Sequence, residues 1–480
     1  MKVVELKRYK KEGDKIMLNR SKNLLPIGLL LLALTAPFSS PLACAAQTVG
    51  DSPSRSGAPN VLTREGSDAD ATDSTPPQAT PKTGGPTGGF SKLADQVQVF
   101  NRYAPTRETW TTINLGTKYL KAVAGGFEQG AMMGFGLQAT TADRLRFVEL
   151  RATAFTSPNL YRRFEGEAYI PKFFDKKTHA DVWFDYLRRT KDNFFGIGPL
   201  VANTAQTNYD LERRSFNATL YHDFTPRIKA GGYVSVANTS SYRGQKDRDI
   251  PIDLLFSGNP NTVPVARWAP GLLENTKILS YGGFVQYDLR NASRGLTKGA
   301  YFYGRVGSSE GLKHKLDFSD YGWLEMELDA RGYIPLFSDK TSLAVRGYAT
   351  LKDPRGGSQI PFYDLSFLGG RMYGRGFKDF RYHGNNLALD SAELRRTIWT
   401  QSEERGLDAF GFGEAGQVWG DNRSQTDPLI LANRDFESKS WRASVGGGVQ
   451  YRYSRSLAAR VEVGHSHERN LIYVSLTRGF

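Results

Sequence analysis

The stretch "WRASVGGGVQYRY" at residues 441–453 alternates between two kinds of side chain. One parity is apolar and holds Trp441, Ala443, Val445, Val449, Tyr451 and Tyr453, whereas the other holds Arg442, Ser444, Gln450 and Arg452. Successive side chains of a β-strand point to opposite faces, so this pattern predicts a strand between two different surroundings. A soluble β-sandwich produces the same pattern, but charged inward positions in strand after strand favour a barrel around a wet lumen.

The same alternation recurs along most of the chain from about residue 130. "SYGGFVQYDLR" at 280–290 is a second clear example. We locate fifteen such segments, near 130–142, 145–157, 161–171, 179–190, 207–222, 228–241, 277–290, 299–308, 320–334, 341–352, 386–398, 407–419, 439–453, 457–466 and 470–480. Their connections alternate between short and long, as in outer-membrane barrels. Counting back from the C-terminus requires one more strand before 130, for which "WTTINLGTKYL" at 110–120 is a candidate. We therefore predict an all-β fold, a transmembrane antiparallel β-barrel of sixteen strands.

Composition agrees with a barrel better than with a helical protein. The 480 residues include 50 Gly, 23 Tyr and 28 Phe, which suit turns, crowded walls and interfacial girdles. One apolar run exists, "LLPIGLLLLALTAP" from Leu24 to Pro37, and it is too short to span a bilayer comfortably. The formal net charge of +14 would also fit nucleic-acid binding, but a secreted chain argues against that partner. Arginines in the lumen and contacts with anionic lipid headgroups explain the charge better.

The N-terminal part is expected to hold no folded domain. Basic residues precede the apolar run and "ACAA" follows it, which predicts a secretory signal peptide over 1–46, with Met17 as a possible true start. Cleavage there would remove Cys44, the single cysteine; Pro41 disfavours a lipoprotein signal at this cysteine. Residues 47–89 are rich in Ser, Thr, Pro and Gly and predict a disordered linker. Residues 90–129 are expected to form a short helix, within 90–106, and a possible first strand, and 130–480 the barrel.

The C-terminal segment "LIYVSLTRGF" alternates and ends on Phe480. A terminal aromatic residue that closes an alternating strand is typical of bacterial outer-membrane barrels. We therefore expect Phe480 to be the assembly signal, the barrel assembly machinery to be a partner during biogenesis, and the bacterial outer membrane and its lipids to surround the protein.

Several short stretches, taken in their order and spacing, carry a resemblance to a known family. They are "NFFGIGP" at 193–199, "YDLRNASRGLTKGAY" at 287–301, "IPFYDLSFLGG" at 360–370, "LGGRMYGRGF" at 368–377, "ALDSAELR" at 388–395 and "FGEAGQVW" at 412–419. Over roughly residues 125–480 the chain resembles the outer-membrane assembly and two-partner-secretion transporter superfamily, whose barrel is called the bacterial surface antigen domain. Members of that family carry periplasmic domains that receive polypeptides, and we expect none here.

The resemblance implies a specific contact inside the barrel. A long external loop, here 353–385, folds inward, and its tip of Gly374, Arg375, Gly376 and Phe377 meets an acidic residue on the wall, here Glu414. A guanidinium in a narrow lumen needs a carboxylate, and a bidentate pair would fix the tip. Two features differ from the family, which usually has Asp at the wall position and an aliphatic residue in place of Gly374. Phe410 and Phe412 share the parity of Glu414 and weaken the pattern of polar inward residues.

Two other motifs were weighed and not adopted. "GSSEG" at 307–311 matches the nucleophile pattern around Ser309, but it lies at a predicted strand end and not at a strand-to-helix turn. "HSH" places His465 and His467 on one strand face, yet no third ligand lies nearby in the sequence. We expect no enzyme activity, no catalytic residue, no metal and no cofactor.

Function is therefore expected at the membrane. The first hypothesis is insertion or transport of proteins or lipids at the outer membrane, with an unknown client. The alternative is a passive channel gated by loop 353–385. A barrel enzyme, such as a lipase or protease, is the third and least supported hypothesis.

Overall fold

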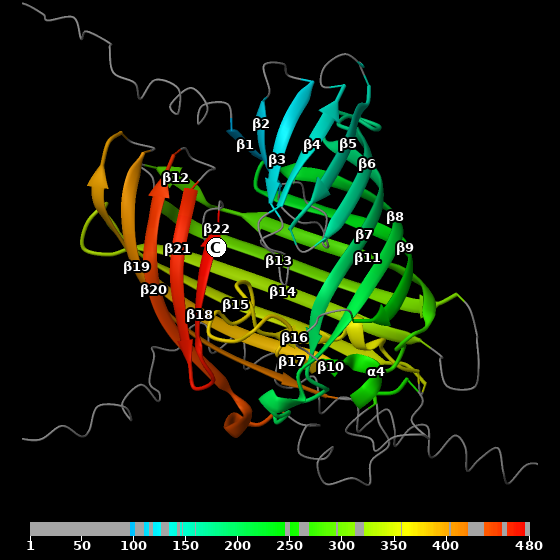
Figure 1. Ribbon diagram of the computed structural model, residues 1–480. Coiled ribbons are helices and arrows are strands. Elements are labelled where there is room, and N and C mark those ends of the chain that lie inside the picture. Colours follow the sequence, from blue (N-terminus) through cyan, green and yellow to red (C-terminus); the bar gives the residue numbers. More distant parts are fainter. Residues whose placement is uncertain are drawn as a thin grey trace, which may run out of the picture. The chain divides into compact units, whose positions relative to one another are not determined.

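Strands account for nearly all regular structure in the computed structural model of the chain (Figure 1). It describes residues 97–100, 110–114, 119–125, 134–141, 145, 147–158, 160–244, 250–258, 268–293, 296–312, 321–356, 358–402, 405–420, 436–453 and 458–475. The predicted signal peptide (1–46), the predicted linker (47–89) and Phe480 lie outside these residues. None of the helices it describes is long and apolar enough to cross a membrane.

Sixteen strands follow one another from residue 120 to residue 475 in one antiparallel sheet. They are β3 (Leu120–Gly125), β4 (Gly134–Thr140), β5 (Glu149–Thr156), β6 (Arg162–Ile170), β7 (Thr178–Phe194), β8 (Thr207–Thr225), β9 (Ile228–Arg243), β11 (Asn275–Asp288), β13 (Leu296–Gly311), β14 (Gly322–Pro335), β15 (Thr341–Pro354), β18 (Asn386–Thr400), β19 (Gly406–Trp419), β20 (Arg442–Arg452), β21 (Ala458–Ser466) and β22 (Asn470–Ser475). All fifteen segments predicted from alternation are confirmed as strands over the residues that the structure describes. The sixteenth, β3, begins at the last residue of the 110–120 candidate.

Each strand pairs with the next along the chain, so the sheet is a continuous meander. β15 pairs with β18 across the long segment between them, with Tyr348 opposite Leu389. Smaller elements add to the sheet: β1 (Val97–Phe100), β2 (Trp110–Asn114), β10 (Ile250–Pro251) and β12 (Asn291–Ser293). The expected helix over 90–106 is contradicted at β1, because "VQVF" alternates and pairs with β2 as a strand.

The two faces of the sheet have opposite chemistry. On β20, Ser444, Gln450 and Arg452 are buried while Val445 and Val449 are exposed. The same inversion holds on β11, where Gln286 is buried and Val285 and Tyr287 are exposed. Polar residues gather on what we call the inner face and large apolar residues on the outer face. A protein surrounded by water would show the reverse arrangement.

The connections alternate in length, so the sheet has two different ends. One end, the short-turn end, holds connections such as 226–227, 336–340 and 401–405. The other, the long-loop end, holds 195–206, 244–274, 355–385 and 420–441. The loops at this end form an apolar cluster together with neighbouring strand residues, built around Phe194 of β7 and the loop residues Ile252, Phe256, Ile360 and Phe362.

Residues 355–385, the inner loop, lie against the inner face (Figure 1). The inner loop contains β16 (Ser366–Leu368) and β17 (Tyr382–Gly384), which pair with each other. A second apolar cluster joins the inner loop to the wall: Leu368, Phe377 and Tyr382 from the inner loop meet Tyr348, Leu387, Leu389 and Val418 from β15, β18 and β19.

Candidate functional site

Glycines shape the tip of the inner loop. Gly369, Gly370 and Gly374 have φ values of 126°, 85° and 129°, a region that side chains with a Cβ rarely adopt. The turn is closed by the backbone N–H of Phe377, which donates to the carbonyl of Gly374 at 3.0 Å. The positive φ of Gly374 explains why a glycine stands where the family usually has an aliphatic residue.

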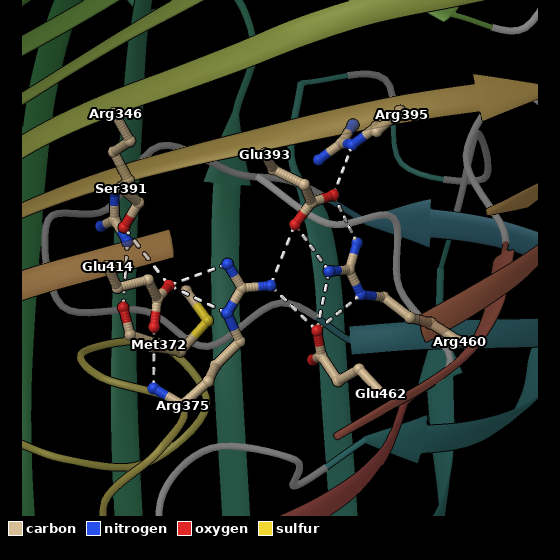
Figure 2. A network of polar contacts seen from close by, with 9 residues as sticks. All are labelled: Arg346, Met372, Arg375, Ser391, Glu393, Arg395, Glu414, Arg460 and Glu462. Atoms are coloured by element: carbon tan, nitrogen blue, oxygen red, sulfur yellow. Dashed lines mark hydrogen bonds and ion pairs between the residues drawn. The ribbon is translucent and has the colours of Figure 1, made fainter. Parts of the chain in front are cut away.

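Arg375 at the tip binds Glu414 of β19 through both its backbone and its side chain (Figure 2). The backbone N–H donates to Oε2 of Glu414 at 2.8 Å, and Nε donates to Oε1 at 2.9 Å. The terminal nitrogen Nη2 lies 2.9 Å from the same Oε1. One carboxylate therefore fixes the position of the loop backbone and the direction of the guanidinium together.

Two further carboxylates reach the same guanidinium. Nη1 of Arg375 donates to Oε2 of Glu393 on β18 and to Oε2 of Glu462 on β21, both at 2.9 Å. Arg460 bridges these two carboxylates, and Arg395 donates to Glu393 at 2.6 Å (Figure 2). We call these six residues the clamp. The wall supplies three carboxylates and two guanidiniums, a net charge of −1, which Arg375 neutralises.

Two aromatic rings lie under the guanidiniums. The Cζ atom of Arg375 lies 3.4 Å from the centre of the Phe412 ring, and that of Arg460 lies 3.7 Å from the centre of the Phe410 ring. Phe410 and Phe412 therefore belong on the inner face, where a cation stacked on a ring is stabilised. Their parity, which weakened the sequence pattern, is part of the site.

Glycines of β20 and β21 make room for this layer. A Cβ on Gly446 would lie 2.4 Å from the Phe412 ring, and one on Gly448 would lie 2.8 Å from the Phe410 ring. A Cβ on Gly464 would lie 2.1 Å from the carbonyl oxygen of Arg375. The inner loop backbone thus approaches the wall at a distance that only glycine permits.

The rest of the tip is also buried. The carbonyl of Gly376 accepts a hydrogen bond of 2.6 Å from Oγ of Ser466. Phe377 is fully buried, with its ring edge-on to Tyr382 and to His467 at 5.7 and 5.8 Å between centroids. Burying such a ring contributes roughly 1.5–3 kcal/mol, which adds an apolar anchor beside the charged one.

Electrostatics favour the charged form of Arg375. Burial alone would lower the pKa of this guanidinium, but Glu414, Glu393 and Glu462 outweigh that effect and raise its pKa. The side chain is 3% exposed, so the charge is held away from bulk water by its three carboxylate partners.

A second wall holds the inner loop by different means. Nη1 of Arg346 on β15 donates to the main-chain carbonyl of Met372 at 3.0 Å, while its other nitrogens bind Asp329 on β14. The ammonium of Lys352 binds the main-chain carbonyl of Asp364. Arg213 on β8 binds the carboxylate of Asp364 as well.

A third contact lies at the long-loop end. Arg381 donates to Glu468, between β21 and β22, at 2.9 and 3.0 Å, and also to the carbonyl of Val201 at 2.8 Å. Tyr382 donates to the same carboxylate at 2.7 Å. Burial raises the pKa of Glu468, but these hydrogen bonds and the Arg381 charge more than compensate and lower it overall.

The sequence predicted five of the residues that meet at this site and missed four others. Gly374, Arg375, Gly376, Phe377 and Glu414 come together at one place. Glu393, Arg395, Arg460 and Glu462 were missed, although "ELR" and "RVE" each put opposite charges two residues apart on one strand face.

The two motifs that were set aside lie elsewhere. Ser309 lies within strand β13, not at a strand-to-helix turn. His465 contacts Asn470, and His467 contacts Phe377. Among the described residues, no group of three or more His, Cys, Asp or Glu side chains could hold a metal ion.

An antiparallel meander with a polar inner face, an apolar outer face and a loop held within defines the class of protein. The fold is all-β, a transmembrane antiparallel β-barrel with an inward-folded loop. The inner face is the lumen wall, and the clamp lies within the lumen.

Comparison with known proteins gives the family. The model of the Omp85 superfamily domain matches residues 147–461, and the chain belongs to this superfamily. The crystal structure of BamA from Haemophilus ducreyi lacking POTRA domains 1-3 is similar, with a TM-score of 0.55, 15% identity, and coverage of 80% of this chain and 75% of that one. CdiB from Escherichia coli aligns with a TM-score of 0.47 and 13% identity over 79% of this chain and 65% of its own. No curated protein sequence matches.

Proposed function

We propose that this chain is an integral barrel of the bacterial outer membrane that takes part in inserting or transporting proteins or lipids there. The observation that carries the proposal is the clamp, in which carboxylates from β18, β19 and β21 converge on one guanidinium of the inner loop. The family and the fold support the location, and the resemblance to assembly and secretion barrels supports the activity. Barrel assembly machinery and outer-membrane lipids are the expected partners during biogenesis.

A side-chain clamp suits a loop that must hold its place and yet be released. Every wall carboxylate that binds Arg375 has another partner as well: Arg460 and Arg395 bind Glu393, Arg460 binds Glu462, and Ser391 donates to Glu414 at 3.3 Å. Removing Arg375 therefore leaves the wall partly paired. The inner loop can leave at a smaller electrostatic cost than a lone buried ion pair would impose.

The test is insertion of an unfolded outer-membrane barrel substrate into vesicles that contain the purified full-length protein. We expect the protein to speed substrate folding above the rate in empty vesicles, and Arg375→Ala to change that rate. Gly413→Ala is the matched control, because a Cβ at this glycine of β19 would meet nothing within 4 Å. An insertion rate equal to that in empty vesicles, for the wild type, would reject the proposal.

A passive channel gated by the inner loop is the second candidate, favoured by the apolar cluster that the inner loop forms with the wall. Conductance across planar bilayers separates the two functions. A channel should gain a stable, large conductance when residues 369–381 are replaced by a short Gly-Ser linker, with no insertion activity before or after. An assembly protein should lose insertion activity through the same replacement.

A further inference from the structure

Basic side chains gather on the outer face of β6 to β11, near the long-loop end. These strands are neighbours in the sheet (Figure 1). Arg162 on β6 stands directly opposite Arg188 on β7, and Arg188 stands opposite Glu212 on β8. The same row continues with Ser240 on β9 and Asn275 on β11. All five side chains share the outer face with exposed apolar residues.

A second row follows two residues nearer the short-turn end. It contains Phe164, Tyr186, Arg214, Asn238 and Lys277, again in register across the same strands. Arg214 is 62% exposed, binds Glu212 at 2.7 Å, and lies over the ring of Tyr186 at 5.9 Å. We call the two rows the basic belt. Four cations and one carboxylate give it a net charge of +3.

A third row, one step further, is apolar: Phe184, Phe216, Val236 and Leu279, with Gly166 on β6. Phe184 and Phe216 are 41% and 55% exposed. One step of two residues is about 7 Å along a strand, so the surface changes from basic to apolar over that distance. This is the profile of a boundary between lipid headgroups and lipid tails.

The belt does not continue onto β14. On β14, the outer face carries Leu324, Met326 and Leu328, with no charge. Charged residues on the lipid-facing surface are unfavourable near the bilayer centre and well tolerated at the interface. Interfacial depth thus permits arginines on β6 to β8, but it does not account for their being placed side by side.

The opposed arginines indicate an anion. Like charges directly opposite each other on neighbouring strands are destabilising. Among the described residues, neither Arg162 nor Arg188 has an ion-pair partner, and Glu212 is engaged by Arg214. A phosphate between two guanidiniums would neutralise both and accept bidentate hydrogen bonds from each. Ser240 and Asn275, linked by a hydrogen bond of 2.9 Å, continue the same row beyond Glu212 and add no charge to it.

We propose that the basic belt binds the phosphates of a phosphorylated glycolipid of the outer leaflet, with Arg162 and Arg188 sharing one phosphate and Phe164, Phe184 and Phe216 contacting its acyl chains. A bisphosphorylated glucosamine lipid fits because the belt is two rows deep and five strands wide. Lys277 of the second row is available to a second phosphate, whereas Arg214 is already engaged by Glu212. The inference rests on the outer-membrane location proposed above, with the long-loop end outermost.

The test uses the full-length protein in phosphatidylcholine nanodiscs and measures binding of fluorescent bisphosphorylated lipid A. Arg162→Gln with Arg188→Gln should weaken binding about tenfold or more, as expected for the loss of two charge-assisted contacts. Arg396→Gln is the matched control, since Arg396 is also an exposed arginine of a strand but lies opposite Thr341, near the short-turn end. The affinity of the Arg396→Gln variant for lipid A should change less than about twofold. Heat-modified mobility on gels checks that every variant is folded.

Two outcomes would overturn the proposal. One is equal lipid A binding by the double variant and the wild type. The other is equal affinity for phosphatidylglycerol, which would show general attraction to anionic lipid and no phosphate site. Insertion activity is measured on the same samples, so a wild type that inserts the substrate but does not bind lipid A rejects only this inference. Lipid binding without insertion would reject only the proposed function.

Discussion

The inner loop touches two walls of the barrel, and each wall holds it differently. The β18–β21 wall has an excess of carboxylates in the clamp and takes a side chain of the inner loop, Arg375. The β13–β15 wall carries Arg305, Arg331, Arg346 and Lys352 against Glu325, Glu327 and Asp329, a net charge of +1. Its spare donors bind main-chain carbonyls of the inner loop, at Met372 and Asp364.

The difference separates two kinds of attachment. Contacts to a carbonyl persist whatever side chain the loop residue carries, whereas the clamp depends on one arginine. A point mutation at Arg375 can therefore remove the ion pairs to the β18–β21 wall, where the carbonyl of Gly376 still binds Ser466, while the β13–β15 wall keeps all its contacts. Trypsin cleavage at Arg371, Lys378 or Arg381 reports release of the inner loop.

The largest effect is expected from Arg375→Ala. Three buried carboxylates would lose a shared cation, and the loss of one partner of a buried ion pair destabilises by about 3–5 kcal/mol. Water in the lumen should bring the value to the lower end of this range. The measurement is the temperature at which heat-modified mobility on gels is lost, together with the rate of trypsin cleavage.

Glu414→Ala supplies the control for that change. It should have a smaller effect, because Glu393 and Glu462 still bind Arg375. The double variant should be clearly less than additive, since the two residues touch. Glu414→Asp keeps the charge and should be mild. Strict additivity of the two alanine changes would show that the pair contributes no coupling.

Gly464→Ala should act through shape and leave every charge in place. The added Cβ would overlap the carbonyl of Arg375, whose backbone cannot retreat without breaking its bond to Glu414. Overpacking of this kind costs typically about 1–3 kcal/mol. Gly413→Ala, with open space around its Cβ, should leave melting and trypsin cleavage unchanged. Similar behaviour of the two variants would contradict the close approach at Gly464.

Acid should loosen the inner loop independently of both walls. His383 on β17 is buried against Phe194, with ring centroids 5.0 Å apart, and burial lowers its pKa from 6.5 to about 3. A released loop takes up a proton below pH 6.5 and the packed loop does not, so stability falls between pH 6.5 and 3. The expected loss is about 2 kcal/mol at pH 5, from roughly 1.4 kcal/mol per pH unit.

The measurement for His383 is trypsin sensitivity after brief exposure to each pH, compared with His383→Leu. The leucine variant should lose the pH dependence between 6.5 and 5. If both proteins respond equally to acid, another group is responsible for the response.

The smallest effect is expected from Met372→Ala. Its carbonyl binds Arg346 and would stay in place, and the half-buried side chain should contribute about 1 kcal/mol or less. Melting and trypsin cleavage should stay close to those of the wild type. A loss as large as that of Arg375→Ala would show that the β13–β15 wall also depends on a side chain.

Most strands could be predicted from the sequence, because side chains that alternate between a lipid-facing and a water-facing surface leave a local pattern of period two. The first strands were harder to predict. Leu120–Gly125, "LKAVAG", is short and small-chained, and β1 to β3 owe their pairing to each other more than to any pattern of their own. The expected helix over 90–106 failed at β1, where the alternation of "VQVF" covers only four residues.

About half of the residues that meet at the site could be predicted from the sequence. Arg375 and Glu414 lie in stretches that carry the family resemblance, and Glu414 shares the inward parity. Glu393 and Glu462 could not be assigned to the clamp, because most strands have charged inward residues and only register decides which ones meet. In the sheet, Glu393 stands opposite Phe412, Phe412 opposite Gly446, and Gly446 opposite Gly464. Only this register explains why an aromatic residue and two glycines lie on the inner face beside the clamp.

The glycines beside the clamp also have a mechanical consequence. Gly411 pairs with Gly447, and Gly446 pairs with Gly464, so neighbouring strands there share no contact between side chains. Cross-strand side-chain pairs stiffen a sheet, and glycine within strands weakens it. The wall from β19 to β21 is therefore one of the compliant stretches of the described sheet; another holds the pairs Gly283–Gly232 and Gly282–Gly307 on β9, β11 and β13. A load that flattens or widens the barrel should bend it along these lines, one of which lies immediately beside the residue that holds the inner loop.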